Sequence, residues 1–80
     1  RIAKCESGNK HFDSKGKVIR GRINKSDVGR FQVNEKVWGK IAKGLKIDMY
    51  SESGNEEMAR YIYAIRGTED WKFSKLCWSK

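Results

Sequence analysis

Apolar residues recur at helical spacing in the middle of the chain. This pattern predicts a helix over 35–45, with Asn34 as its N-cap. Its apolar residues fall at positions i, i+3, i+4 and i+7, and they are Trp38, Ile41, Ala42 and Leu45. Gly39 and Gly44 weaken this helix, because glycine loses more backbone freedom in a helix than other residues do.

A second amphipathic pattern predicts a stronger helix over 54–66. Ser53 or Asn55 can cap its start, the acidic residues that follow suit the N-terminal end of the helix dipole, and Gly67 ends it. Its predicted apolar face consists of Met58, Tyr61, Ile62 and Ile65. Tyr63 lies off this face and is therefore a candidate to line a cleft.

The remaining segments are shorter. Residues 1–7 read as the end of a helix that Gly8 stops, and the pattern over 10–23 changes to period two around a turn at 14–17, which predicts a small β-hairpin. The tail over 68–78 predicts a short helix that covers the core with four apolar side chains, namely Trp71, Phe73, Leu76 and Trp78. The predicted fold class is α+β, mostly helical, with one small hairpin.

The chain has 80 residues, of which 38% are hydrophobic, and this predicts one domain over 1–80 with a thin core. Such a core gains from a crosslink. A disulfide between Cys5 and Cys77, the chain's two cysteines, would join its N- and C-terminal segments and would imply an oxidising compartment. Two free thiols are the alternative reading.

The net charge is +8, from 18 Lys and Arg against 10 Asp and Glu. The basic residues are spread along the chain, which indicates either a solubilising surface or an anionic partner such as nucleic acid, acidic lipid or a cell-wall polymer. The sequence contains no apolar run of 18 residues, so we expect a soluble chain without membrane insertion. Nothing at Arg1 resembles a signal peptide, so an exported form would be mature or trimmed.

Few residues offer chemistry. His11 is the only histidine, and the spacings typical of metal sites and of phosphate-binding glycine loops are absent, so we expect no metal and no cofactor. What remains is acid chemistry at Glu6. A carboxyl at the C-terminal end of a helix and near aromatic residues can stay protonated near neutral pH, as a general acid requires. A solvated acid at a helix end is the simpler reading of the same residue.

Several short motifs occur in a characteristic order along nearly the whole chain. They are Ile2-Ala3-Lys4-Cys5-Glu6-Ser7-Gly8, Asp27-Val28-Gly29-x-x-Gln32-Val33-Asn34, Asn55 followed by Ala59-x-x-x-Tyr63, Gly67-Thr68-x-x-Trp71 and Cys77-Trp78. In this order they resemble the soluble lytic transglycosylase domains of the lysozyme-like superfamily. The first motif is also similar to that of resuscitation-promoting factors, which have a small relative of the same fold.

This resemblance implies a minimal lysozyme-like domain that cleaves the β-1,4 bond between N-acetylmuramic acid and N-acetylglucosamine in peptidoglycan. Glu6 then acts as general acid and base, and the substrate's own 6-hydroxyl attacks the anomeric carbon to form a 1,6-anhydro product. The implied substrate-binding residues are Ser7, Gln32, Asn34 and Tyr63. From the residues alone, Gln32 could instead face solvent, and Asn34 could simply cap the helix that follows it.

Two other functions fit the same residues. A goose-type hydrolytic lysozyme would need a second carboxylate, for which Asp27 is better placed than Asp13, although both also read as turn residues. A non-enzymatic basic module for cell wall or nucleic acid would make Glu6 incidental. The transglycosylase reading implies peptidoglycan glycan strands as the partner, no nucleic acid, a monomer, and an extracytoplasmic location that is secreted, periplasmic or virion-associated.

Overall fold

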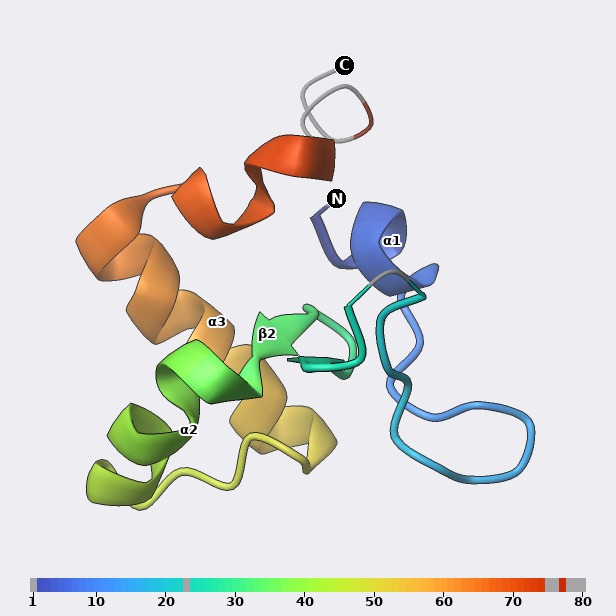
Figure 1. The fold of residues 1–80 in the computed structure, drawn as a ribbon, viewed down its shortest axis with the longest axis horizontal. Coiled ribbons are helices and arrows are strands. Elements are labelled where there is room, and N and C mark those ends of the chain that lie inside the picture. The colour runs from blue at the N-terminus through green and yellow to red at the C-terminus, as the bar shows by residue number, and fades with distance from the viewer. Residues whose placement is uncertain (1, 23, 75–76, 78–80) are drawn as a thin grey trace.

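The structure of this protein is a computed structural model that describes residues 2–22, 24–74 and 77 (Figure 1). Its elements in chain order are helix α1 (Ile2–Ser7), strands β1 (Asp27–Val28) and β2 (Val33–Asn34), helices α2 (Glu35–Gly44) and α3 (Glu52–Arg66), and a 3-10 helix η1 (Glu69–Ser74). Over the described residues, the fold is therefore a small α+β fold with three α-helices and one antiparallel hairpin, as predicted at this level. Within the described residues, no helix is long and apolar enough to cross a membrane.

Helix α2 starts as the sequence predicts. The Asn34 side chain accepts hydrogen bonds from the backbone N–H groups of Lys36 and Val37, which have no partner inside the helix. The predicted apolar face is too wide, however: Trp38 and Ala42 are buried, whereas Ile41 and Leu45 are 40% and 44% exposed. The helix contacts the core along a narrow strip, and the neighbouring apolar strip faces outward.

Helix α3 begins earlier than predicted, at Glu52. Its cap is Ser51, whose hydroxyl accepts from the Gly54 N–H at 3.0 Å, so the predicted caps Ser53 and Asn55 are wrong. Asn55 cannot cap the helix because its side chain lies in the core.

The buried face of α3 also differs from the predicted one. Met58 and Ile62 are buried as expected, but Tyr61 is 36% and Ile65 56% exposed. Asn55 and Ala59 take their places on the buried face, since only a narrow side of the helix meets the rest of the molecule.

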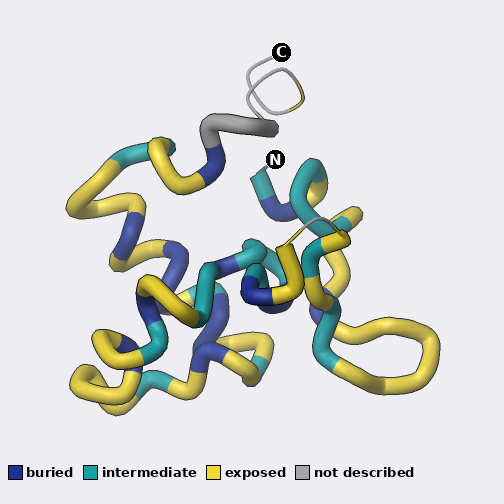
Figure 2. Tube along the Cα trace, viewed as in Figure 1, coloured by how far each residue is buried: buried dark blue, intermediate teal, exposed yellow. Residues whose placement is uncertain are grey.

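The hairpin lies downstream of its predicted position over 10–23. In that segment a single bridge pairs Phe12 with Val18, and the loop between them is exposed (Figure 2). The Asp13 carboxylate holds this loop by accepting from the N–H groups of Lys15 and Lys17. The chain then pairs Arg20 with Val28, so the paired strands form at 27–28 and 33–34 instead.

The core gathers side chains from β1, β2, α2, α3, η1 and the segment between α2 and α3. Its buried members are Val28, Val33, Trp38, Ala42, Met49, Met58, Ala59, Ile62 and Trp71. Trp71 confirms that the tail folds onto the core, and its indole N–H donates to the Phe31 carbonyl at 2.7 Å. The predicted contacts of the Phe73 side chain, Leu76 and Trp78 lie outside the described part of the chain.

The disulfide between Cys5 and Cys77 is present, so the reading as two free thiols is wrong. It connects α1 to the residue that follows η1 by three positions. Helix α1 lies beside η1 in the fold, and the crosslink holds together segments 72 residues apart in sequence (Figure 1).

Candidate active site

Glu6 occupies the last turn of α1, on the side of this helix that faces the rest of the molecule. Because helical residues i and i+4 share a face, Glu6 lies one turn beyond Ile2, and Ser7 one turn beyond Ala3. Ala3 is buried, and Ile2 packs against the core. Glu6 itself is half-buried, so its position differs from that of a fully solvated acid at a helix end.

Ser7 fastens the end of α1 to the turn between the two strands. Its hydroxyl oxygen lies 2.7 Å from the Arg30 carbonyl oxygen and 3.1 Å from that of Ala3, its own helix neighbour. The contact with Arg30 brings together two segments 23 residues apart. The residue that follows Glu6 is thus in direct contact with the Gly29–Gln32 turn.

Gln32 closes this turn and has an uncommon backbone conformation. Its φ is 52°, in the left-handed region, which costs a residue with a side chain about 1 kcal/mol. Both its backbone N–H and its side-chain amide donate to the Gly29 carbonyl, at 3.1 and 2.9 Å. The side chain is half-buried and held against the turn, rather than extended into solvent.

His11 is buried and holds the Gly29–Gln32 turn by a hydrogen bond. Its Nδ1 accepts from the Arg30 N–H at 3.1 Å, and its Nε2 lies 2.7 Å from the Tyr50 carbonyl oxygen. A ring that accepts at Nδ1 must carry its proton at Nε2, which then donates to Tyr50. The only histidine therefore positions backbone groups and takes no part in a catalytic pair among the described residues.

Asn55 supports the turn from the side of α3. Its Oδ1 accepts from the Phe31 N–H at 2.8 Å, and its amide donates to the carbonyl oxygens of Val28 and Met49 at 2.9 and 3.0 Å. Asn55 is fully buried, and each of these three bonds goes to the main chain. The turn next to Glu6 is thus held by two buried polar side chains, His11 and Asn55.

Asp27 and Asn34 face each other across the hairpin. They are paired in its register, and the Asn34 amide donates to the Asp27 carboxylate at 3.0 Å. The Asn34 Oδ1 caps α2 at the same time, so both ends of this amide have partners within the protein. Of the two readings of Asn34 left open by the sequence, the structure contains the cap.

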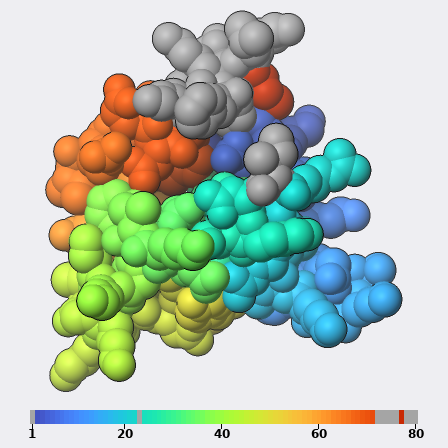
Figure 3. All heavy atoms as spheres, in the orientation of Figure 1, coloured from blue at the N-terminus to red at the C-terminus, as the bar shows by residue number. Residues whose placement is uncertain are grey.

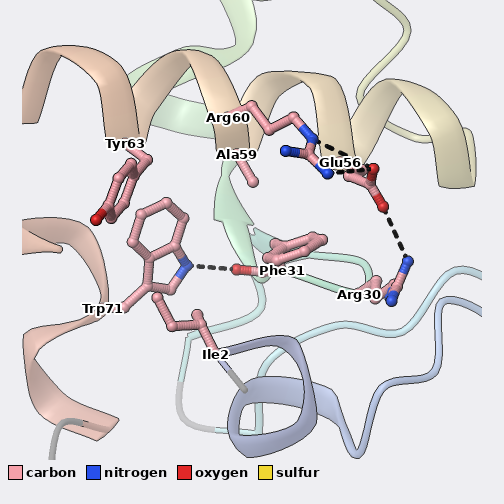
Figure 4. Close-up of a pocket in the computed structure, with 8 residues that line it drawn as sticks. All are labelled: Ile2, Arg30, Phe31, Glu56, Ala59, Arg60, Tyr63 and Trp71. Carbon is pink, nitrogen blue, oxygen red and sulfur yellow. Dashed lines mark hydrogen bonds and ion pairs between the residues drawn. The ribbon is translucent and has the colours of Figure 1, made fainter. Parts of the chain in front are cut away.

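A pocket of about 450 Å³ lies beside α1, which contributes Ile2 to its lining, whereas Glu6 is not among the lining residues (Figure 4). Its lining residues are Ile2, Arg30, Phe31, Glu56, Ala59, Arg60, Tyr63 and Trp71. Tyr63, which the sequence singles out as lying off the core face of its helix, is 58% exposed at one end of this pocket. The ring of Trp71 lies next to it, and Arg30 lies at the opposite end.

Charges at the pocket are arranged around one carboxylate. Arg30 and Arg60 both pair with Glu56, at 3.1 and 3.2 Å. Arg30 also donates to the Asn9 side chain at 2.7 Å, and its guanidinium lies over the Phe31 ring. The two guanidinium groups and the one carboxylate together give this side of the pocket a net positive charge, which suits an anionic or polar ligand.

A second cluster of charged groups lies at the start of α2. Glu35 accepts from the Tyr50 hydroxyl at 2.7 Å and from Arg20 at 2.6 Å. The Tyr50 hydrogen bond, followed by that of Arg20, lowers the pKa of the Glu35 carboxyl below its ordinary value. The same bond raises the pKa of the Tyr50 hydroxyl. This cluster joins three segments of the chain.

Sequence reasoning missed several residues that shape this region. Arg30 lies within the predicted motif, yet neither its stacking on Phe31 nor its ion pair with Glu56 has a local signal. The roles of His11 and Asn55 depend on partners far away in sequence, such as Tyr50. Among residues 2–22, 24–74 and 77, no three His, Cys, Asp or Glu side chains lie close enough together to hold a metal ion.

The chain was compared with models of protein families, with curated proteins and with solved structures, and none of the three comparisons gave a match.

Proposed function

We propose that this protein is a peptidoglycan-cleaving muramidase of lysozyme-like fold, and that it acts as a lytic transglycosylase with Glu6 as general acid and base. The observation that carries this proposal is the contact between its two motif segments. Ser7 lies 2.7 Å from the Arg30 carbonyl oxygen, so the helix end that bears Glu6 lies against the turn that ends at Gln32. The motif resemblance requires these segments to form one site.

Three features of the site support the chemistry. Glu6 is half-buried at the end of α1, next to the residue that contacts the turn. The left-handed conformation of Gln32 is a local cost of the kind that often accompanies functional sites. The pocket beside α1 offers the rings of Tyr63 and Trp71 and the guanidinium of Arg30, groups that suit a polar ligand with apolar faces.

In the proposed reaction, Glu6 protonates the glycosidic oxygen as the bond from that oxygen to the anomeric carbon breaks. The 6-hydroxyl of the same muramic acid then attacks the anomeric carbon and gives its proton to Glu6. The carboxyl is regenerated, no water is consumed, and the product is a 1,6-anhydro sugar. This route needs a single carboxylate, in agreement with an Asn34 that is engaged as a helix cap.

The Cys5–Cys77 disulfide supports an extracytoplasmic location, where such bonds persist and where peptidoglycan lies. The net charge of +8 supports an anionic polymer as partner.

The proposal is tested by the release of soluble fragments from purified peptidoglycan. We expect the wild-type protein to release fragments and Glu6→Gln to lose at least 100-fold in rate, since general acid–base catalysis contributes roughly 10²–10⁴-fold. Glu57→Gln is the matched control, because Glu57 is an exposed acid of α3 that does not line the pocket. A folded wild-type protein without activity, or a Glu6→Gln variant as active as Glu57→Gln, would contradict the proposal.

A further inference from the structure

Helix α2 carries an apolar strip on its outside that no described element covers. The strip consists of Val37, Ile41 and Leu45, which follow one another at intervals of four residues and are 60%, 40% and 44% exposed. The core-facing residues of this helix, Trp38 and Ala42, lie on the adjacent strip. Val37, Ile41 and Leu45 are called the α2 apolar strip below. Figure 3 shows the part of the chain that forms α2, in green, at the surface of the molecule.

Lysines flank this strip on the side away from the core. Lys36, Lys40 and Lys43 are exposed and share a face, because they are spaced at i, i+4 and i+7. The only acid of α2, Glu35, already pairs with Arg20 and accepts from Tyr50. The outer surface of α2 is thus divided lengthwise into an apolar strip and a cationic strip.

We propose that this face of α2 docks on an anionic phospholipid surface. A helix with one apolar and one lysine-rich side lies in the interface of such a membrane, with its aliphatic side chains among the acyl chains and its ammonium groups at the headgroups. The attraction of lysine for an anionic leaflet adds to the apolar contribution. A second copy of this chain fits the face poorly, because two lysine strips and two net charges of +8 would repel each other.

An anionic polymer without apolar groups would match the lysines but leave the α2 apolar strip in water. The apolar strip and the lysines together therefore favour lipid over a soluble polyanion. The proposed docking does not depend on glycan cleavage, since no residue of α2 contributes to the Glu6 site.

The test is co-sedimentation with vesicles that contain phosphatidylglycerol and phosphatidylcholine, compared with vesicles of phosphatidylcholine alone. We expect binding to the anionic vesicles only. Ile41→Asn should weaken it roughly tenfold, as expected when one aliphatic side chain no longer enters the apolar region. Ile65→Asn is the matched control: Ile65 is more exposed than Ile41 but belongs to α3, and its substitution should change binding less than twofold.

The cationic strip has its own pair of variants. Lys40→Gln should weaken binding roughly fivefold, which corresponds to the contribution of one lysine near an anionic leaflet. Lys15→Gln removes the same charge from the exposed loop at 13–17 and should have little effect. Thermal unfolding of each variant by circular dichroism checks that it is folded.

Three results would overturn the proposal. The first is a folded wild-type protein that does not sediment with anionic vesicles. The second is binding that Ile65→Asn and Lys15→Gln weaken as much as the α2 variants do, which would indicate a diffuse charge effect. The third is tighter binding to soluble polyphosphate that depends on Lys40 but not on Ile41, which would indicate a polyanion partner.

Discussion

Gly29 lies in the turn between the two strands, directly against His11 and Asn55, the buried side chains that hold this turn. Its φ is 78°, and a Cβ atom at this position would lie 2.6 Å from the His11 ring and 2.7 Å from the Asn55 amide. Both neighbours are fixed by their hydrogen bonds to the main chain, so neither can move aside easily. The turn can therefore adopt this conformation only with glycine at position 29, because any other residue would bring a Cβ atom into contact with His11 and Asn55.

We predict that Gly29→Ala lowers the free energy of unfolding by about 3 kcal/mol, from strain at positive φ together with overpacking. Gly39 offers a control with the opposite sign, since it lies in the middle of α2 and an added Cβ would meet no atom within 4 Å. Gly39→Ala should raise the free energy of unfolding by roughly 0.5–1 kcal/mol. Urea unfolding measures both changes. Equal effects of the two substitutions would contradict this account of the turn.

The role of a single residue can be predicted from the sequence when its partners are close to it along the chain. Asn34 could be recognised as a cap because its partners are two and three residues away. His11 and Asn55 could not be assigned, since each bonds to main-chain groups more than 15 residues away that only the folded chain brings near. The same limit applies to the pocket, where Arg30 and Glu56 come from different elements.

At the scale of elements, helical periodicity located α2 and α3 but overestimated what they bury. Ile41 and Ile65 fit the apolar pattern and yet lie at the surface, because a chain of 80 residues has too few elements to cover both sides of each helix. The predicted position of the hairpin, over 10–23, is too early in the chain, because the alternating residues at 18–22 resemble a strand. Strand pairing depends on the partner, and here Arg20 pairs with Val28 instead of with the preceding segment.

The Arg20–Glu35–Tyr50 cluster makes the junction of three segments sensitive to acid. The pKa of Glu35 is lowered in the folded state, so the folded protein binds this proton more weakly than the unfolded chain does. Its contribution to stability is therefore present above the ordinary value of 4.5 and is lost as the pH falls through the lowered pKa.

We predict that Glu35→Gln reduces this acid dependence. The urea midpoint of the wild-type protein, compared between about pH 6 and about pH 3, should fall more than that of the variant. Glu57→Gln serves as the control, because Glu57 is another exposed acid outside this cluster. If the wild type and Glu35→Gln lose stability in parallel, the cluster does not contribute as described.

At the scale of the whole molecule, the disulfide joins the two ends of a fold with a thin core. Helix α1 has six residues, too few to be stable alone, and it is held by the bond from Cys5 to Cys77 and by the contact of Ser7 with Arg30. The crosslink could be predicted because the chain has two cysteines and one pairing. The crosslink also restrains the position of Glu6, because Cys5 is the residue directly before it.

We predict that replacing Cys5 and Cys77 together by Ala lowers the free energy of unfolding by about 4 kcal/mol, the chain-entropy value for a loop of this size. Guanidinium unfolding of the double variant against the oxidised protein gives this difference. Reduction of the wild-type protein should reproduce the loss, and a change below about 1 kcal/mol would mean that the crosslink constrains little.

The reaction proposed at Glu6 is tested most directly by the mass of the muropeptides released from purified peptidoglycan. We expect fragments that end in a 1,6-anhydro sugar, each lighter by one water than the corresponding reducing-end product, and no such fragments from Glu6→Gln. Reducing-end fragments would contradict the transglycosylase and indicate a hydrolase, with Asp27 as the carboxylate to test next. No fragments from a folded wild-type protein would contradict the enzyme itself.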